Sequence, residues 1–228
     1  GAISNRYTQI SSIKGDFIGN NATSSSGIRK GGAIYNYDGD IDNITGDFIN
    51  NYSNQGGAVW NGYYGHLSNI AGDFIGNSVS GTNSYGGAAY NSATIDNITG
   101  HFIVNNSSGN EEAYGGAIYN TGSNAKINNI TGDFIGNYAT SQASANGGAI
   151  YADYGSYIGN ITGDFIGNYA SGQNRAFGGA IYDNGVVRYI NGNFIGNYAK
   201  GQLFAGGGAL YLNSSGILTG TFIDNYVT

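Results

Sequence analysis

The sequence predicts an all-β fold: a right-handed, single-stranded parallel β-helix of about eight rungs with three short strands in each rung. Two phrases that recur in alternation predict it. Phe-Ile-x-Asn occurs eight times at intervals of 26 to 32 residues, and Gly-Gly-Ala followed by an aliphatic residue falls once in each interval. Repeats of this length stack, so that each unit buries its apolar side only against its neighbours. The right hand is the one that parallel crossover connections usually take.

The elements follow in the same order in every repeat, as the second repeat illustrates. Ile44, Gly46 and Phe48 share one face of an alternating stretch, and this period of two indicates a strand. We expect one short strand near Ile41, a second from Ile44 to Ile49, and a third through the Gly-Gly-Ala phrase. The connection from the Asn of Phe-Ile-x-Asn to the next Gly-Gly-Ala is 4 to 10 residues long and is expected to be a surface loop.

Stacking turns each repeated position into a column along the axis. The predicted core column is Phe17, Phe48, Phe74, Phe102, Phe134, Phe165, Phe194 and Phe222. A second core column is Ile13, Ile44, Ile70, Ile98, Ile130, Ile161, Ile190 and Leu218, and a third is Ile34, Val59, Ala89, Ile118, Ile150, Ile181 and Leu210. The paired glycines are expected to let the third strand start at a tight corner.

The asparagines of Phe-Ile-x-Asn are predicted to form a ladder of stacked amides at a bend of the chain. Asn also tolerates the left-handed backbone that such a corner needs. The ladder residues are Asn20, Asn51, Asn77, Asn105, Asn137, Asn168, Asn197 and Asn225.

Composition narrows the class of protein. The chain has 228 residues, 42 of them Gly, no Cys, and a net charge of −6 with scattered cations. A disulfide framework and a thiolate metal site are excluded, and nucleic-acid binding is disfavoured because no basic stripe exists. No apolar run approaches the ~18 residues of a membrane-spanning helix. We expect one domain over residues 1–228, with residues 1–8 as an N-terminal cap or linker, excised from a longer protein.

Phe-x-x-Asn together with Gly-Gly-Ala-(Ile/Leu/Val) resembles the repeat hallmark of the polymorphic outer-membrane proteins, a family of autotransporter adhesins. The first phrase is exemplified by residues 17–20, 134–137 and 165–168, and the second by residues 31–34 and 115–118. The likeness extends over essentially the whole chain, although the transporter barrel of that family is missing. The resemblance implies a β-helical passenger segment with a role in adhesion.

Three outward columns are candidates for contact with other molecules. Alternation turns an aromatic column outward, where stacked rings could bind sugars or proteins or merely shield the strand beneath; the opposite parity, with the rings inside, stays open. An outward Ile column would be too large an apolar patch for a free monomer, so either loops or another chain cover it. The aromatic column is Tyr35, Trp60, Tyr90, Tyr119, Tyr151, Tyr182 and Tyr211, and the Ile column is Ile18, Ile49, Ile75, Ile103, Ile135, Ile166, Ile195 and Ile223.

An acidic column could attract Ca²⁺ through its oxygen ligands, but we expect solvated, hydrogen-bonded side chains, no metal site and no cofactor. This column is Asp16, Asp47, Asp73, His101, Asp133, Asp164, Asn193 and Thr221. No catalytic residue is predicted, because the acidic residues follow the repeat and His66 and His101 fall in different rungs without an evident nucleophile.

The sequence therefore predicts a non-catalytic, extracellular bacterial surface β-helix that serves as an adhesin or stalk of an autotransporter-like protein. Its partners would be a host or matrix protein or glycan, or sibling chains. A filament subunit that stacks head to tail is the first alternative, since ordinary repeats at both ends leave backbone groups unpaired. A carbohydrate-binding or carbohydrate-active β-helix is the second.

Overall fold

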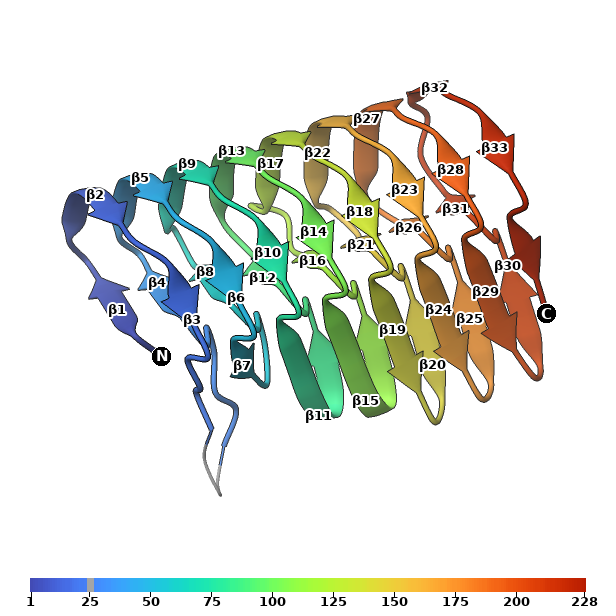
Figure 1. Ribbon diagram of the computed structural model, residues 1–228, viewed down its shortest axis with the longest axis horizontal. Helices are drawn as coiled ribbons and strands as arrows, with labels where there is room; N and C mark the ends of the chain where they lie inside the picture. Colours follow the sequence, from blue (N-terminus) through green and yellow to red (C-terminus); the bar gives the residue numbers. More distant parts are fainter. Residues whose placement is uncertain (24–26) are drawn as a thin grey trace.

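The computed structural model, which describes residues 1–23 and 27–228, is a right-handed parallel β-helix, and this confirms the predicted fold class (Figure 1). Every strand pair that it records is parallel, and equivalent residues of successive repeats face one another, such as Phe48 with Phe74 and Ile34 with Val59. In the described part of the chain, each of three sheets that enclose the body holds eight strands, and a fourth sheet projects from it.

Sheet A follows the Gly-Gly-Ala phrase and sheet B follows sheet A after a turn. Sheet A consists of β1 (Ile3–Arg6), β4 (Ile34–Tyr37), β8 (Val59–Gly62), β12 (Ala89–Asn91), β16 (Ile118–Asn120), β21 (Ile150–Ala152), β26 (Ile181–Asp183) and β31 (Leu210–Leu212). Sheet B consists of β2 (Gln9–Lys14), β5 (Asp40–Thr45), β9 (His66–Ala71), β13 (Thr94–Thr99), β17 (Lys126–Thr131), β22 (Tyr157–Thr162), β27 (Val186–Asn191) and β32 (Ile217–Thr219).

Sheet C holds the Phe-Ile pairs, and the fourth sheet lies between sheet C and the next strand of sheet A. Sheet C consists of β3 (Phe17–Ile18), β6 (Phe48–Ile49), β10 (Phe74–Ile75), β14 (Phe102–Ile103), β18 (Phe134–Ile135), β23 (Phe165–Ile166), β28 (Phe194–Ile195) and β33 (Phe222–Ile223). The fourth sheet, called the fin below, consists of β7 (Tyr52–Ser53), β11 (Ser78–Tyr85), β15 (Asn106–Tyr114), β19 (Tyr138–Ser141), β20 (Ser144–Asn146), β24 (Tyr169–Gly172), β25 (Arg175–Phe177), β29 (Tyr198–Gly201), β30 (Phe204–Gly206) and β34 (Tyr226–Val227).

The division of the rung differs from the predicted one. Ile41 and Ile44 lie on one strand, β5, and both are buried. The chain then turns at Gly46, whose φ is 139°, before the two-residue strand β6 begins at Phe48. A single strand from Ile44 to Ile49 was therefore the wrong interpretation. Its period of two arose because Ile44 and Phe48 both face the core from either side of a corner.

The core is filled by aliphatic columns and one column of rings. The phenylalanine rings stack with centroids 4.6–4.9 Å apart and planes within 1–6° of parallel. From Phe48 to Phe194 these side chains are completely buried, whereas Phe222 in the last rung is half exposed. Ile41, Leu67 and their counterparts add a further buried column on sheet B. Parallel rings whose centroids lie one rung apart are stacked with a sideways offset, an arrangement that aromatic pairs prefer over a face-to-face sandwich.

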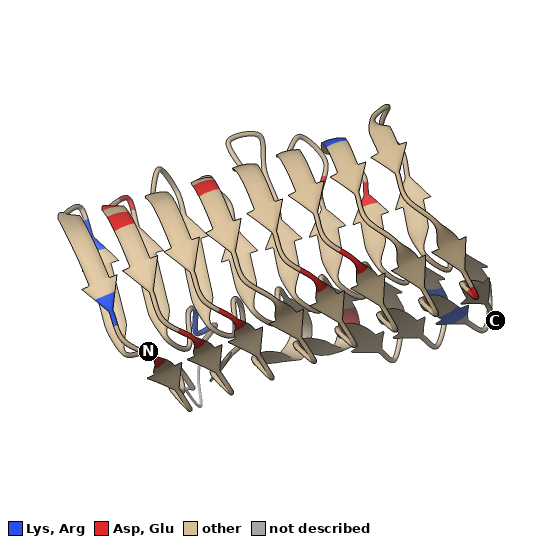
Figure 2. Ribbon diagram, turned by 45° about the horizontal axis from the view of Figure 1, so that its top comes forward, with Lys and Arg blue, Asp and Glu red and all other residues tan. Residues whose placement is uncertain are grey.

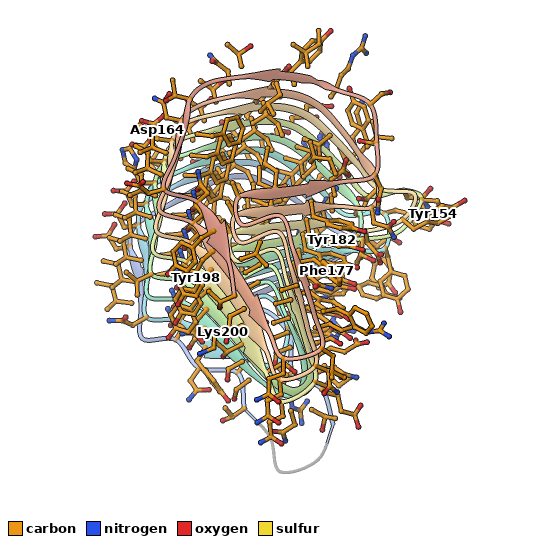
Figure 3. The ribbon with its side chains drawn as sticks, turned by 90° about the vertical axis from the view of Figure 1, so that its right-hand side faces the viewer. Tyr154, Asp164, Phe177, Tyr182, Tyr198 and Lys200 are labelled. Atoms are coloured by element: carbon orange, nitrogen blue, oxygen red, sulfur yellow. The ribbon has the colours of Figure 1, made fainter. Side chains whose placement is uncertain are left out.

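The connections expected to be loops form the fin instead (Figure 3). In each long connection, one leg runs out and a second runs back, and both legs pair with the same legs of the neighbouring rungs. A buried cluster between them consists of alanines alone: Ala113, Ala139, Ala145, Ala170, Ala176 and Ala199. Small side chains let the two legs lie close together, so Ala and Ser content marks a thin double layer here and not a flexible loop.

Each glycine of the Gly-Gly-Ala phrase has its own role at the neck between fin and body. The first glycine is left-handed in every copy, as in Gly147 with φ 63°. The second lies against the outgoing leg: a Cβ on Gly148 would come within 2.5 Å of the carbonyl of Tyr169 and 2.1 Å of the oxygen of Gly179. The tight corner that the sequence predicted is therefore also a crossing of two chain segments, which no larger residue would permit.

Residues 1–8, expected to be a cap or linker, contain β1. Ile3 pairs with Ile34 in the register of the later rungs, so this segment extends sheet A by one strand. Within residues 1–23 and 27–228, no helix is long and apolar enough to cross a membrane.

Candidate binding surface

The predicted Asn residues form a continuous ladder at the exit from sheet C. The backbone N–H and the Nδ2 group of each Asn both donate to Oδ1 of the Asn in the next rung, at 2.9–3.0 Å. Nδ2 also donates to the Phe carbonyl of the preceding rung at 2.7–2.8 Å. Residues Asn51 to Asn197 of the ladder are fully buried. From Asn51 to Asn197 the ladder therefore holds successive rungs together, and its polar groups are used within the protein.

The left-handed backbone at this corner belongs to the residue before the ladder Asn, which corrects the sequence interpretation. Gly occupies this position in most rungs, but Asn50, Val104 and Asp224 occupy it at φ 53–54°. Asn and Asp tolerate this region, whereas for a β-branched residue it is a true outlier. Val104 therefore carries backbone strain that its neighbours avoid.

A second buried Asn ladder lies at the end of sheet A and was missed. Nδ2 of Asn5, Asn36, Asn61 and Asn91 donates to Oδ1 of the next residue in the series at 2.8–2.9 Å, and the series ends at Asn120. The signal was present, because four of the five ladder residues, from Asn36 to Asn120, directly follow the aromatic residue of their rung. Its absence from the later rungs, where Ala152 and Asp183 replace it, concealed the pattern.

The aromatic column faces away from the central core but is not a free surface. Its rings stack with centroids 4.8–5.7 Å apart along sheet A. Trp60, Tyr119 and Tyr151 are nevertheless buried. From Tyr119 onward, the cover comes from aromatic residues on the returning leg of the fin: Tyr85 stacks on Tyr119 at 4.8 Å, and Tyr114 stacks on Tyr151 at 4.7 Å. Figure 3 shows the same arrangement in a later rung, where Phe177 of this leg lies beside Tyr182. Most of the column thus joins the fin to the body.

This packing changes the acidity of the phenols. Burial, reinforced by the negative charge of Asp153, raises the pKa of Tyr90 to about 12. Burial also raises the pKa of Tyr119 and of Tyr151 well above the ordinary range. These side chains are therefore neutral hydrogen-bonding and stacking groups throughout the physiological pH range.

Near the N-terminal end of the column, at the second and third rungs, the fin supplies no aromatic cover, although the Trp60 side chain itself is buried. The connection after Asn51 is short, and β7 ends at Ser53, so no fin aromatic stacks on Trp60. The ammonium group of Lys30 lies over the Trp60 ring instead, 4.2 Å from its centroid. This arrangement combines a cation with aromatic rings at the edge of a cavity.

The Ile column lies on the outside of sheet C, next to stacked tyrosines of the fin. Ile18, Ile166 and Ile223 are exposed, and the other members are partly buried. Tyr138 and Tyr169 stack at 5.0 Å and run parallel to this column. The result is a continuous ridge of half-covered apolar groups.

Acidic residues recur along the turns between sheets B and C (Figure 2). This acidic column caps backbone groups of the next rung. The N–H of Asp73 donates to Oδ1 of Asp47, and the other members repeat this contact at 2.8–3.1 Å. At His101, Nδ1 accepts the bond from the N–H of Asp133. Among the described residues, no group of three or more His, Cys, Asp or Glu side chains could hold a metal ion.

The two histidines make separate contacts. Nε2 of His66 lies 2.8 Å from Oδ2 of Asp96, whose Oδ1 accepts a hydrogen bond from Asn128. His101 belongs to the acidic column on another face. No hydroxyl contact to either histidine is recorded among the described residues, so the geometry supplies neither with a nucleophile.

Residues 131–153 match the family model of the Chlamydia polymorphic membrane protein repeat. This stretch contains Phe-Ile-Gly-Asn at residues 134–137 and Gly-Gly-Ala-Ile at residues 147–150, the two phrases that recur through the chain. No curated protein and no solved structure matches the chain. A parallel β-helix with such repeats fits the passenger of an autotransporter-like surface protein. Residues 131–153 thus carry a repeat of the polymorphic membrane protein type, which confirms the resemblance predicted from the two phrases.

Proposed function

We propose that this chain is a non-catalytic segment of a bacterial surface protein, displayed outside the cell as a rigid stalk with adhesive edges. The observation that carries the proposal is the separation of roles along each rung. The core columns and the buried Asn ladder are uniform from rung to rung, whereas the fin tips and the turns between sheets A and B differ in length and sequence. A rigid repeat that presents variable loops suits recognition of a host or matrix protein or glycan.

Adhesion is tested with beads that carry the purified chain, applied to epithelial cells and to extracellular matrix. We expect more beads to bind than beads coated with the same chain after alkaline unfolding. If folded and unfolded chains bind equally weakly to every surface, the adhesive part of the proposal is wrong. If the folded chain is a rod but binds none of these surfaces, only the stalk part of the proposal remains.

A second candidate is a filament in which copies stack end to end. At the C-terminal rung Phe222 is 49% exposed and Leu218 is 38% exposed, although their equivalents in the preceding rung are buried. The ladder is also directional: Asn225 offers an amide donor at this face, while the Oδ1 of Asn20 accepts no ladder bond. A first rung placed on this face would continue both the apolar stack and the ladder.

The filament is tested by light scattering and electron microscopy over a hundredfold range of concentration. We expect rods that lengthen with concentration, and a Leu218→Lys variant that stays short because it buries a charge at the contact. Tyr154→Lys, on a turn far from the rung face, is the matched control. Particles of one size at every concentration would exclude this candidate.

A further inference from the structure

A notch interrupts the wall of the β-helix at the third rung, where the turn from sheet A to sheet B is shorter than the corresponding turns of both neighbouring rungs. Tyr90 and Ile95 are five positions apart, but the paired positions Trp60 and Leu67 are seven apart and Tyr119 and Ile127 are eight apart. Because the strands stay in register, the extra residues of the flanking turns protrude on both sides of the short one. The space between them is a cavity of about 380 Å³.

One side of the notch is an aromatic wall formed by Tyr63 and Tyr64. Tyr64 is 76% exposed and Tyr63 is 54% exposed, which is unusual for adjacent large rings. Tyr63 has a φ of 63°, a conformation that costs a non-glycine residue energy. Its ring packs 4.1 Å from that of Tyr37 and 6.3 Å from that of Trp60. The strained turn thus holds an aromatic surface open to solvent.

A positive charge lies in the same cavity. Lys30 lines it, over the face of Trp60, and no carboxylate lies within ion-pairing distance of its ammonium group among the described residues. Burial lowers the pKa of Lys30. The guanidinium group of Arg6 lies 5.1 Å from the ring of Tyr35, which itself stacks on Trp60 at 4.9 Å. Two cations therefore lie on neighbouring rings in a chain whose net charge is −6.

The opposite side of the notch supplies hydroxyl and amide groups from Ser92, Thr121, Ser123 and Asn124. We propose that the notch binds an acidic saccharide, with the sugar carboxylate at Lys30, a sugar ring on the face of Tyr64 or Tyr63, and sugar hydroxyls at the polar side. This inference rests on the adhesive function proposed above and names the class of ligand. It also limits the aromatic column as a binding surface to the end that the fin leaves open.

An acidic peptide fits this site less well than a saccharide. Peptides commonly bind by adding a strand to a free sheet edge, but β12 below the notch is paired on both sides, with β8 and β16. The cavity volume is near the lower end of the roughly 300–1,000 Å³ range of small-ligand pockets. Aromatic faces, a few polar groups and one cation suit the alternating apolar and hydroxyl surfaces of a charged sugar.

The test measures binding of three probes to the purified chain by isothermal titration calorimetry. A hyaluronan tetrasaccharide presents uronate groups, 3′-sialyllactose presents the carboxylate of sialic acid, and lactose is the neutral probe. We expect at least one acidic probe to bind, about tenfold or more tightly than lactose, because a charge-assisted hydrogen bond is lost with the neutral sugar. The probe that binds identifies whether the source is a uronate or a sialic acid.

Two variants locate the contact. Lys30→Gln should weaken the acidic probe about tenfold, and Tyr64→Ala should weaken it roughly threefold to tenfold through the loss of one stacking face. Lys126→Gln removes another cation that lies over a tyrosine ring, and Tyr154→Ala removes an 81% exposed tyrosine from a different turn. Both controls should bind as the unchanged chain does.

The proposal is overturned if no acidic probe binds, or if lactose binds as tightly as the acidic probes. It is also overturned if Lys30→Gln and Tyr64→Ala both bind like their controls while circular dichroism shows that all variants are folded. Competition by polyglutamate with equal strength also overturns it in favour of an acidic protein partner. The bead assay separates this result from the proposed function. If the variants no longer bind the sugar but still bind cells, adhesion occurs through another surface. If the unchanged chain binds the sugar but not cells, the notch is a saccharide site and the proposed adhesive function is wrong.

Discussion

Replacement of Val104 by glycine should stabilise the protein. Val104 has a φ of 54° at a corner where most rungs have Gly. A β-branched residue there stores roughly 2–3 kcal/mol of strain, the upper part of the range for left-handed residues. The valine side chain is 49% exposed, so its removal costs roughly 0.7 kcal/mol of burial. Glycine also makes the unfolded chain more flexible, at about 0.7 kcal/mol. The net gain is about 1 kcal/mol.

Urea titration followed by circular dichroism and by the fluorescence of Trp60 measures this gain, and the melting temperature should rise by about 2–4 °C for a chain of this size. Gly136→Val, at the same corner of the next rung, is the reciprocal variant. A Cβ on Gly136 meets only Cγ2 of Val104, at 3.7 Å, so the new side chain has space and the backbone alone is strained. This variant should lose about 1 kcal/mol of stability.

Val104→Ala separates strain from packing, because alanine loses the same methyl groups as glycine but remains an L-residue with a Cβ. Its gain should be smaller than that of Val104→Gly. The backbone hydrogen bond from the Val104 N–H to the Ile135 carbonyl, 2.9 Å long, is available to all three residues. If Val104→Gly lowers the urea midpoint while Gly136→Val leaves it unchanged, the strain argument is refuted.

Three further predictions concern the ladder, the neck and the tyrosines. Asn137→Ala should lower the free energy of unfolding by about 3–5 kcal/mol in urea titrations, because it removes the acceptor of both Asn105 donors inside a fully buried site. A loss below about 1 kcal/mol would contradict a structural ladder. Gly148→Ala should prevent folding or lower the free energy of unfolding by more than about 3 kcal/mol, because its Cβ would overlap backbone atoms. An unchanged melting temperature would show that the neck can widen. Burial raises the pKa of Tyr90 and of Tyr169 to about 12 from an ordinary 10.0, so the stability they contribute is complete below pH 10 and is lost between pH 10 and 12. Tyrosinate absorbance at 295 nm should then rise together with unfolding, and its appearance in a still folded protein would contradict this coupling.

The stacked architecture was predictable because one core column is Phe in every rung and the other core columns keep an apolar residue at the same position. Phe48, Phe74 and their equivalents mark their own register, and parallel pairing then fixes the positions of Ile44 and Ile34. The fin was not predictable in this way. Most of its inward residues are Ala or Ser, as in Ala139, and these small residues also characterise loops. A fin differs from a loop only in that its legs pair with the legs of neighbouring rungs, and this pairing is not visible within one repeat.

The candidate site was only partly predictable for a different reason. The aromatic column was visible as a repeat, but its cover by Tyr85 and Tyr114 depends on how the fin folds back. The notch arises from a difference between rungs: a shorter turn after Tyr90 and a tyrosine pair at residues 63–64. A search for repeats averages such differences away. The residues proposed here to bind a ligand therefore lie where the repeat is broken.

The alanine interior of the fin governs how the protein can diversify. Since Ala139 and Ala145 belong to one buried cluster between the two legs, enlarging one of them forces the facing leg to move, and that leg is bonded to the rungs on both sides. Sequence drift is thereby confined to the tip beyond the legs and to side chains that face solvent. The tips can therefore be lengthened, shortened or rewritten one at a time while the neck and the body stay unaltered.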